Sequence, residues 1–206
     1  MIDRYALKLL RPVIEASARR AAALGLTADM ATLVGFGMGM AAVVLIAAGY
    51  TWIAVLPLMA NRALDGLDGA LARLTSATDR GAFLDIGLDF VFYAAVPLAF
   101  AFCDVEANAL AAAVLLAAFI GTGTSFLAFA VIAEKRGLKS TAYPSKSFYY
   151  LGGLTEGTET IACFLAMCIW PQHFAVIAYV YAGMCAITTA TRLIAGWHVF
   201  GEDARS

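Results

Sequence analysis

Long apolar runs separated by short polar connections make up most of the 206-residue chain. A helix needs about 20 apolar residues to cross a hydrocarbon core about 30 Å thick, because each residue adds about 1.5 Å. Six runs are of this kind, at about 31–49, 52–73, 82–103, 108–133, 147–169 and 174–199. Hydrophobic residues make up 62% of the chain and charged residues 14%. The pattern therefore predicts an all-α, polytopic membrane protein with six transmembrane helices.

The first 24 residues follow a different pattern, in which charged and apolar positions alternate at helical spacing. Arg4, Lys8, Arg11, Glu15 and Arg19 mark one face, and Gly25 follows the segment. A basic amphipathic helix of this kind is typical of an anionic membrane surface, with an ordinary solvated helix as the alternative. We therefore divide the chain into an interfacial helix, residues 1–24, and a six-helix membrane domain, residues 25–206.

Basic residues are distributed unevenly among the segments that connect the predicted spans. The connections near Tyr50, Asp104 and Pro171 contain no lysine or arginine. The other connections and the termini contain most of the basic residues: Arg4 to Arg20, Arg73, Arg80, Lys135, Arg136, Lys139, Lys146 and Arg205. Because basic segments stay in the cytoplasm, we expect both termini to be cytoplasmic.

Four aspartates interrupt the second and third apolar runs. Asp65 and Asp68 are three residues apart, and Asp85 and Asp89 are four apart, so each pair shares one face of a helix. Both pairs fall near the predicted cytoplasmic edge, since the connection between the two runs is short. Charged groups at this depth are costly and are usually functional. Several convergent carboxylates favour a site for hard divalent cations such as Mg²⁺ or Mn²⁺.

The same region carries a longer motif, D-x-x-D-G-x-x-A-R, then seven residues, then G-x-x-x-D-x-x-x-D. The matching residues are Asp65, Asp68, Gly69, Ala72, Arg73, Gly81, Asp85 and Asp89. This spacing resembles the signature of the CDP-alcohol phosphotransferase (CDP-alcohol phosphatidyltransferase) family. The resemblance implies attack of an acceptor alcohol on the β-phosphate of CDP-diacylglycerol or another CDP-alcohol, with release of CMP. It also implies a homodimer and no nucleic-acid partner.

The resemblance assigns roles to individual aspartates. It implies two ions, Mg²⁺ or Mn²⁺, one held by Asp65, Asp68 and Asp85 and the other by Asp65, Asp85 and Asp89. Asp89 would also be the catalytic base that takes the proton of the acceptor hydroxyl. Such an arrangement agrees with the general need of in-line phosphoryl displacement for neutralised oxygens and a positioned nucleophile.

Five further residues are expected at the CDP-alcohol. Gly69 leaves room for a nucleotide close to the helix, and Arg73 offers a planar donor fork. The resemblance adds Thr32, Asp29 and a hydroxyl near Thr78. The family commonly has asparagine where this chain has Asp29, so this position can accept a hydrogen bond but donates none.

The acceptor pocket has candidates of both charges. Lys135, Arg136 and Lys146 follow the fourth run, Glu156 and Glu159 are acids within the fifth, and Arg192 lies in the sixth. The acids favour a cationic acceptor and the bases a phosphorylated one, so the acceptor stays open. A second hypothesis is a divalent-cation or proton transporter, because intramembrane aspartates also mark ion pathways. Gly69, Ala72 and Arg73 at fixed spacing favour the enzyme.

Overall fold

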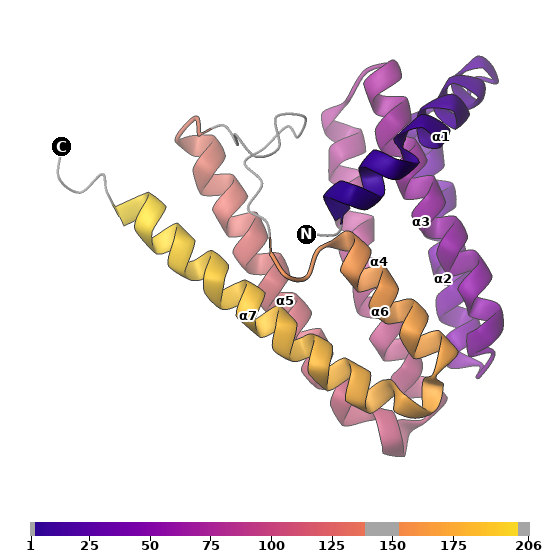
Figure 1. Cartoon of the computed structure of the whole chain (residues 1–206), viewed down its shortest axis with the longest axis vertical. Helices are drawn as coiled ribbons and strands as arrows, with labels where there is room; N and C mark the ends of the chain where they lie inside the picture. Colours follow the sequence, from indigo (N-terminus) through magenta and orange to yellow (C-terminus); the bar gives the residue numbers. More distant parts are fainter. Residues whose placement is uncertain (1–2, 139–152, 202–206) are drawn as a thin grey trace.

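The computed structural model describes residues 3–138 and 153–201, with the side chains of residues 12–138 and 153–201. This part of the chain is helical and contains no strand (Figure 1). The elements are α1 (Asp3–Ala23), α2 (Ala28–Ala47), α3 (Thr51–Leu74), α4 (Asp79–Cys103), α5 (Val105–Lys135), α6 (Gly157–Ile169), the 3₁₀ turn η1 (Pro171–His173) and α7 (Phe174–Gly201).

Short polar side chains and glycines set the helix boundaries. Thr27 and Thr78 cap α2 and α4, since their hydroxyls accept from the backbone N–H three residues on. Asp104 caps α5 in the same way. Gly25, with φ of +80°, follows α1, and it adopts the left-handed conformation that favours glycine. The predicted end of the first helix at this glycine is therefore confirmed.

Four of the helical segments are long and apolar enough to cross a membrane. They are α2, α4, α5 and the segment Pro171–Gly201 that comprises η1 and α7. Helix α3 is as long but carries the charged residues of the motif, and α6 is a shorter apolar helix. The all-helical membrane architecture is thus confirmed, while the count of six spans stays a prediction.

The fifth helix differs from the predicted run, which began at residue 147. Within the described residues it begins at Gly157, and residues 153–156 are not helical. Residues 147–152 lie outside the described part of the chain. Glycines at 153 and 157 disfavour a helix here, because glycine loses more backbone entropy than other residues. Glu156 is consequently the residue before the helix and not part of it.

Helix α2 packs against both α3 and α4, whereas α3 and α4 make few close backbone contacts with each other. The short connection after α3 predicts that these two helices are antiparallel neighbours; they face each other through side chains and not through close backbone contact. The facing surfaces of α3 and α4 carry carboxylates, which repel each other and do not form a dry helix interface. The intervening space is where the aspartates project.

Aromatic side chains form the core below the aspartates. Phe92 of α4 meets Phe164 of α6 edge to face with ring centroids 6.1 Å apart. Phe100 stacks on Phe174 at 4.5 Å. Such pairs add to the stability that burial alone provides.

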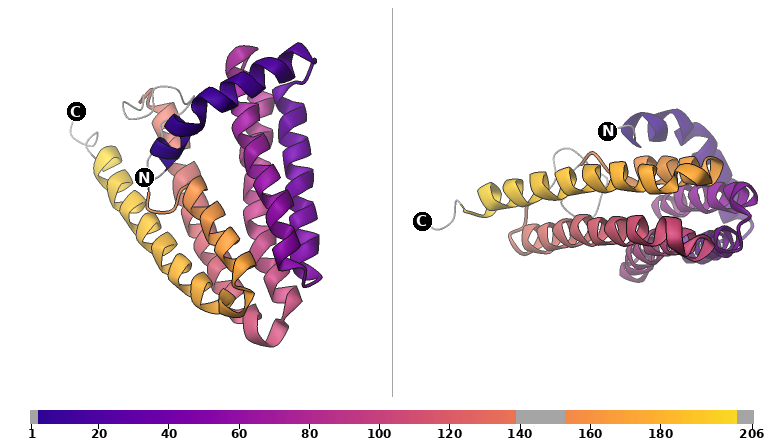
Figure 2. Two further views of the ribbon diagram at one scale, coloured as in Figure 1. Left: turned by 45° about the vertical axis from the view of Figure 1, so that its right-hand side comes forward. Right: turned by 90° about the horizontal axis from the view of Figure 1, so that it is seen from below.

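Helix α5 packs against its neighbours through small residues. A Cβ added to Gly123 would lie 2.6 Å from Cε1 of Phe90, on α4. A Cβ on Gly121 would lie 3.1 Å from Oγ1 of Thr189, on α7. Because only glycine leaves room for these approaches, the small residues allow close helix contact within the chain. Figure 2 shows α5 and α7 side by side.

Helix α1 lies across the end of the bundle at which α3 ends and α4 begins (Figures 1 and 2). Ala18 and Ala21 pack on Ala31, Ala70 and Leu71. Ile14 reaches Gly66, where an added Cβ would be 3.5 Å from Cδ1 of Ile14. Gly66 lies between Asp65 and Asp68 in the chain, so α1 supports the segment that carries them. The membrane-surface role of α1 stays a prediction.

Candidate functional site

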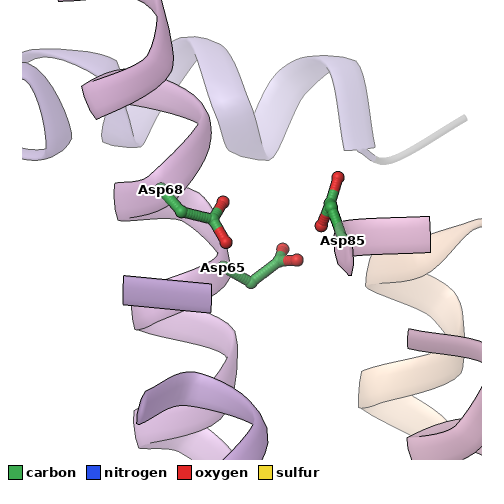
Figure 3. A group of neighbouring side chains, drawn as sticks. All are labelled: Asp65, Asp68 and Asp85. Carbon is green, nitrogen blue, oxygen red and sulfur yellow. The ribbon is translucent and has the colours of Figure 1, made fainter. Parts of the chain in front are cut away.

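Three of the predicted aspartates come together at the end of the bundle covered by α1. Each of Asp65, Asp68 and Asp85 offers one carboxylate oxygen, and these three atoms all lie within 4.8 Å of one another. Figure 3 shows the two α3 carboxylates and the α4 carboxylate converging on the space between the helices. The structure therefore brings three of the four predicted aspartates together, while their depth in the membrane stays a prediction.

The fourth aspartate lines the same cavity. Asp89 lies one helical turn after Asp85 on α4, and therefore further from the end where α4 begins. The cavity is open and has a volume of about 20 Å³, enough for a water-sized particle. Its lining comprises Thr32, Gly35, Phe36, Asn61, Asp65, Asp68, Asp85, Leu88, Asp89 and Phe92. The four carboxylates thus share the cavity with Thr32, Asn61 and apolar residues.

Each of the two α3 aspartates is in contact with a hydrogen-bond donor. The hydroxyl of Thr32, on α2, donates to Oδ2 of Asp68 at 2.6 Å. The guanidinium of Arg62 forms an ion pair with Asp65, three residues later on α3. Asp68 is buried and Asp65 is half-buried, so these donors offset part of the mutual repulsion of the carboxylates.

The donor set suits a hard divalent cation. Carboxylate oxygens are the ligands that Mg²⁺ and Mn²⁺ prefer, and softer donors such as histidine are missing from the lining of this cavity. Three oxygens that already lie within 4.8 Å of one another need little rearrangement to share an ion. The residues present therefore fit the cations expected from the sequence.

The predicted nucleotide residues lie around this cluster in two groups. On α3, a Cβ added to Gly69 would meet only Nη1 of Arg73, at 3.5 Å, so the backbone at Gly69 is accessible. At the start of α4, a Cβ on Gly81 would lie 3.0 Å from Oδ1 of Asp29 and 3.1 Å from Oγ1 of Thr78. The structure therefore brings Asp29 and Thr78 together at the signature glycine.

Asp29 has a partner that the sequence reading did not include. Nε of Arg80 donates to Oδ2 of Asp29 at 2.9 Å, which joins the first turns of α2 and α4. Asp29 alone offers no donor, but the Asp29–Arg80 pair presents both an acceptor and donors. Asp29 and Arg80 are 51 residues apart in the sequence, so local spacing could not predict this pair.

Two of the acceptor candidates meet near Gly153. The backbone N–H of Gly153 donates to Oε1 of Glu156 at 3.2 Å, and a Cβ on Gly153 would lie 3.3 Å from Nη2 of Arg192. Arg192 is buried, donates to the carbonyl of Thr122 at 3.1 Å and faces the Phe126 ring at 5.4 Å. Glu159 lies in the first turn of α6.

The remaining acceptor candidates lie elsewhere. Lys135 ends α5 and Arg136 follows it, and Nη2 of Arg136 donates to the carbonyl of Phe200 at 3.0 Å. Arg136 thus joins the ends of α5 and α7. Lys146 lies outside the described residues. The Phe200 carbonyl that Arg136 contacts lies eight residues after Arg192 on α7, about 12 Å along the helix axis.

Arg62 and Asn61 are site residues that the sequence reading missed. Asn61 is buried, lines the cavity and donates to the carbonyl of Gly35 at 3.0 Å. Arg62 precedes Asp65 by three residues and therefore shares its helix face. That spacing, together with the cost of a charge within an apolar run, could have identified Arg62 as a site residue from the sequence.

The fold and the site define a polytopic membrane protein with a carboxylate cluster at one end of its helical bundle. The chain belongs to the CDP-alcohol phosphatidyltransferase family, which it matches over residues 25–197. It is also 49% identical to the inner membrane protein YnjF of Escherichia coli (strain K12) over 197 residues, 96% of each chain. The chain is therefore an integral membrane protein and a transferase of phospholipid biosynthesis.

Two solved structures share the fold. The crystal structure of Mycobacterium tuberculosis phosphatidylinositol phosphate synthase (PgsA1) with CDP-DAG bound has a TM-score of 0.72 and 23% identity, over 90% of this chain and 94% of that one. The structure of the same synthase in complex with manganese and citrate has a TM-score of 0.71 and 24% identity, over 89% and 88% of the two chains.

Proposed function

We propose that the chain transfers a substituted phosphate group, such as phosphatidyl, from a CDP-alcohol to an acceptor alcohol and releases CMP. The donor would be CDP-diacylglycerol or another CDP-alcohol. The observation that carries this proposal is the convergence of Asp65, Asp68 and Asp85, with Asp89 lining the same cavity. All four belong to the signature of the family to which the chain belongs.

In this proposal Asp65, Asp68 and Asp85 hold one divalent ion, and Asp65, Asp85 and Asp89 hold a second. Two such ions, Mg²⁺ or Mn²⁺, would neutralise charge on the phosphate oxygens during displacement. The M. tuberculosis synthase, whose structure includes manganese, supports divalent metal use. The clustered carboxylates of this chain support it independently.

Asp89 is proposed as the general base. The acceptor oxygen bonds to the β-phosphorus, and the bond from that phosphorus to the oxygen bridging to the α-phosphate breaks. CMP leaves with that oxygen, and Asp89 takes the proton of the acceptor hydroxyl. Its position one turn after Asp85 supports this role, because the acceptor can then approach from the deeper side of the cavity.

The nucleotide would bind beside the ions, on the α2–α3–α4 side of the site. The accessible backbone at Gly69 and the neighbouring Arg73 support one contact. Thr32, Asp29 and Thr78 are proposed as further contacts, with Arg80 supplying donors beside Asp29. Lys135, Arg136, Lys146, Glu156, Glu159 and Arg192 remain candidates for the acceptor side.

We further propose six spans, in which α3 and the run 147–169, whose described helical part is α6, complete the four apolar segments. Both termini and the site would face the cytoplasm, where the basic connections lie. Helix α1 would rest on the membrane surface, and two copies of the chain would form a homodimer. Reagent labelling of single cysteines at the two sides of the membrane tests the orientation.

The experiment that tests the function is CMP release by the purified protein in detergent. The protein would receive CDP-diacylglycerol, Mg²⁺ or Mn²⁺, and one acceptor at a time from a panel that includes glycerol 3-phosphate, serine, inositol, inositol phosphate and choline. CMP that forms with one acceptor and disappears on chelation establishes the reaction and identifies the acceptor. Absence of both CMP release and CDP-diacylglycerol binding would refute the proposal and favour the cation-transporter hypothesis.

A further inference from the structure

We propose that Thr32 and Arg62 are positioning residues that hold the two α3 aspartates ready to bind divalent cations. The inference rests on the proposed metal-dependent function. It gives Thr32 a task in addition to the proposed nucleotide contact, and it gives Arg62, which lies outside the motif, a task in the site.

Thr32 joins α2 to the acid cluster on α3. Its hydroxyl lies 2.6 Å from Oδ2 of Asp68 and 3.1 Å from the carbonyl oxygen of Ala28. A hydroxyl has one proton to donate, and a charged acceptor at the shorter distance makes the stronger bond. The bond therefore orients the Asp68 carboxylate from a neighbouring helix, which fixes it more firmly than a bond within α3 would.

Arg62 holds Asp65 from within α3 and lies close to two other helices. A Cβ added to Gly157, the first residue of α6, would lie 3.7 Å from both Nη1 and Nη2 of Arg62. The same position is 3.6 Å from the hydroxyl oxygen of Tyr93, on α4. The guanidinium thus lies where α3, α4 and α6 meet, and its ion pair with Asp65 has a defined direction.

Losing either donor should weaken cation binding. Partners that orient metal ligands typically contribute about 10–100-fold to metal affinity. Removal of the Arg62 charge acts in the opposite direction, because it makes the cluster more negative. The two side chains are 28% and 24% exposed, so solvent screens part of that charge effect. We therefore expect the loss of orientation to dominate at both positions.

The test is Mn²⁺ binding to the purified full-length chain in detergent without any substrate, with free Mn²⁺ measured by electron paramagnetic resonance. Thr32→Val keeps the side-chain shape but removes the donor, and we expect a Kd for Mn²⁺ about tenfold higher or more. Thr32→Ser keeps the hydroxyl and should stay within about threefold of the unmodified protein. Arg62→Met should raise the Kd by at least about fivefold.

Arg19→Met is the control for Arg62→Met, because it removes one positive charge from an exposed side chain of α1 that has no role in the proposed site. Its Kd for Mn²⁺ should not change. Thermal unfolding without metal checks that each variant is folded; Thr32→Ala and Arg62→Gln replace any variant that is not.

Three outcomes would overturn the inference. Unchanged Mn²⁺ affinity with weaker CMP binding in Thr32→Val would assign Thr32 to the nucleotide alone. Tighter Mn²⁺ binding in Arg62→Met would make Arg62 a competitor of the cation. Both results leave Mn²⁺ binding and CMP release by the unmodified protein intact, so the proposed function would stand. If the unmodified protein binds no Mn²⁺, the inference and the metal-dependent function fail together.

Discussion

Two glycines of α2 offer a sharp test of the packing that supports the site. Gly39 is buried, and a Cβ there would lie 2.8 Å from Cδ2 of Phe92 and 3.2 Å from Nδ2 of Asn61. Phe92 is 1% exposed and packs on Phe164, while Asn61 donates to the carbonyl of Gly35. Both neighbours are buried and held by these contacts, so a shift of either one disrupts a contact. Gly39→Ala should therefore overpack the cavity lining at Phe92 and Asn61.

Gly37→Ala is the matched control, because a Cβ on Gly37 would meet nothing within 4 Å. The gain in helix propensity, up to about 1 kcal/mol, applies at both positions and cancels in the comparison. Overpacking a core typically costs about 1–3 kcal/mol. For a chain of this size 1 kcal/mol corresponds to about 2–4 °C, so Gly39→Ala should unfold about 2–12 °C below Gly37→Ala.

The assay is thermal unfolding of both variants in one detergent, followed by Mn²⁺ titration. Since Phe92 and Asn61 line the cavity with the aspartates, Gly39→Ala should also bind Mn²⁺ more weakly than Gly37→Ala. Equal unfolding temperatures for the two variants would refute the close approach of α2 to Phe92. Lower stability with unchanged Mn²⁺ affinity would show that this packing stabilises the fold without affecting cation binding.

Three further predictions concern the chemistry. Asp89→Asn should lower CMP release at least about 100-fold while the unfolding temperature stays within a few degrees, because a carboxamide cannot take the acceptor proton; a fully active variant contradicts the base assignment. Gly69→Leu should abolish binding of a CDP-alcohol, measured by equilibrium dialysis, yet leave the fold intact, since only Nη1 of Arg73 lies within 4 Å of an added Cβ; unchanged affinity would contradict a nucleotide site at Gly69. Chelation by EDTA should stop CMP release and added Mg²⁺ or Mn²⁺ should restore it, whereas activity that persists in EDTA would exclude a required divalent ion.

The acid cluster could be predicted from the sequence because it depends on local spacing. Asp65 and Asp68 share a helix face by periodicity alone, and a short connection brings the next helix back at the same depth. The end of the first helix at Gly25 and the apolar runs could also be recognised from a few consecutive residues. The predicted fifth helix included residues 153–156, which are not helical, because that prediction followed the apolar run and gave too little weight to the glycines at 153 and 157.

Contacts between distant segments were not available from spacing. The hydroxyl of Thr32 reaches Asp68 across 36 residues, and Arg80 reaches Asp29 across 51. Thr32 was identified as a site residue by resemblance, but its bond to a metal-ligand candidate was not. Sequence spacing also did not show that the acceptor candidates lie in separate places: Arg136 joins the ends of α5 and α7, whereas Arg192 lies near Glu156.

The sequence alone was sufficient for the helical membrane class, the family and the four aspartates, because burial in lipid forces helices and each motif lies within one or two turns. Only the tertiary structure decided that α2 packs against both α3 and α4, while these two helices make few close contacts with each other. It also decided which donors hold each carboxylate. The reason is physical: a helix face is set by residues three and four apart, whereas the partner that covers it is selected by the packing of the whole bundle.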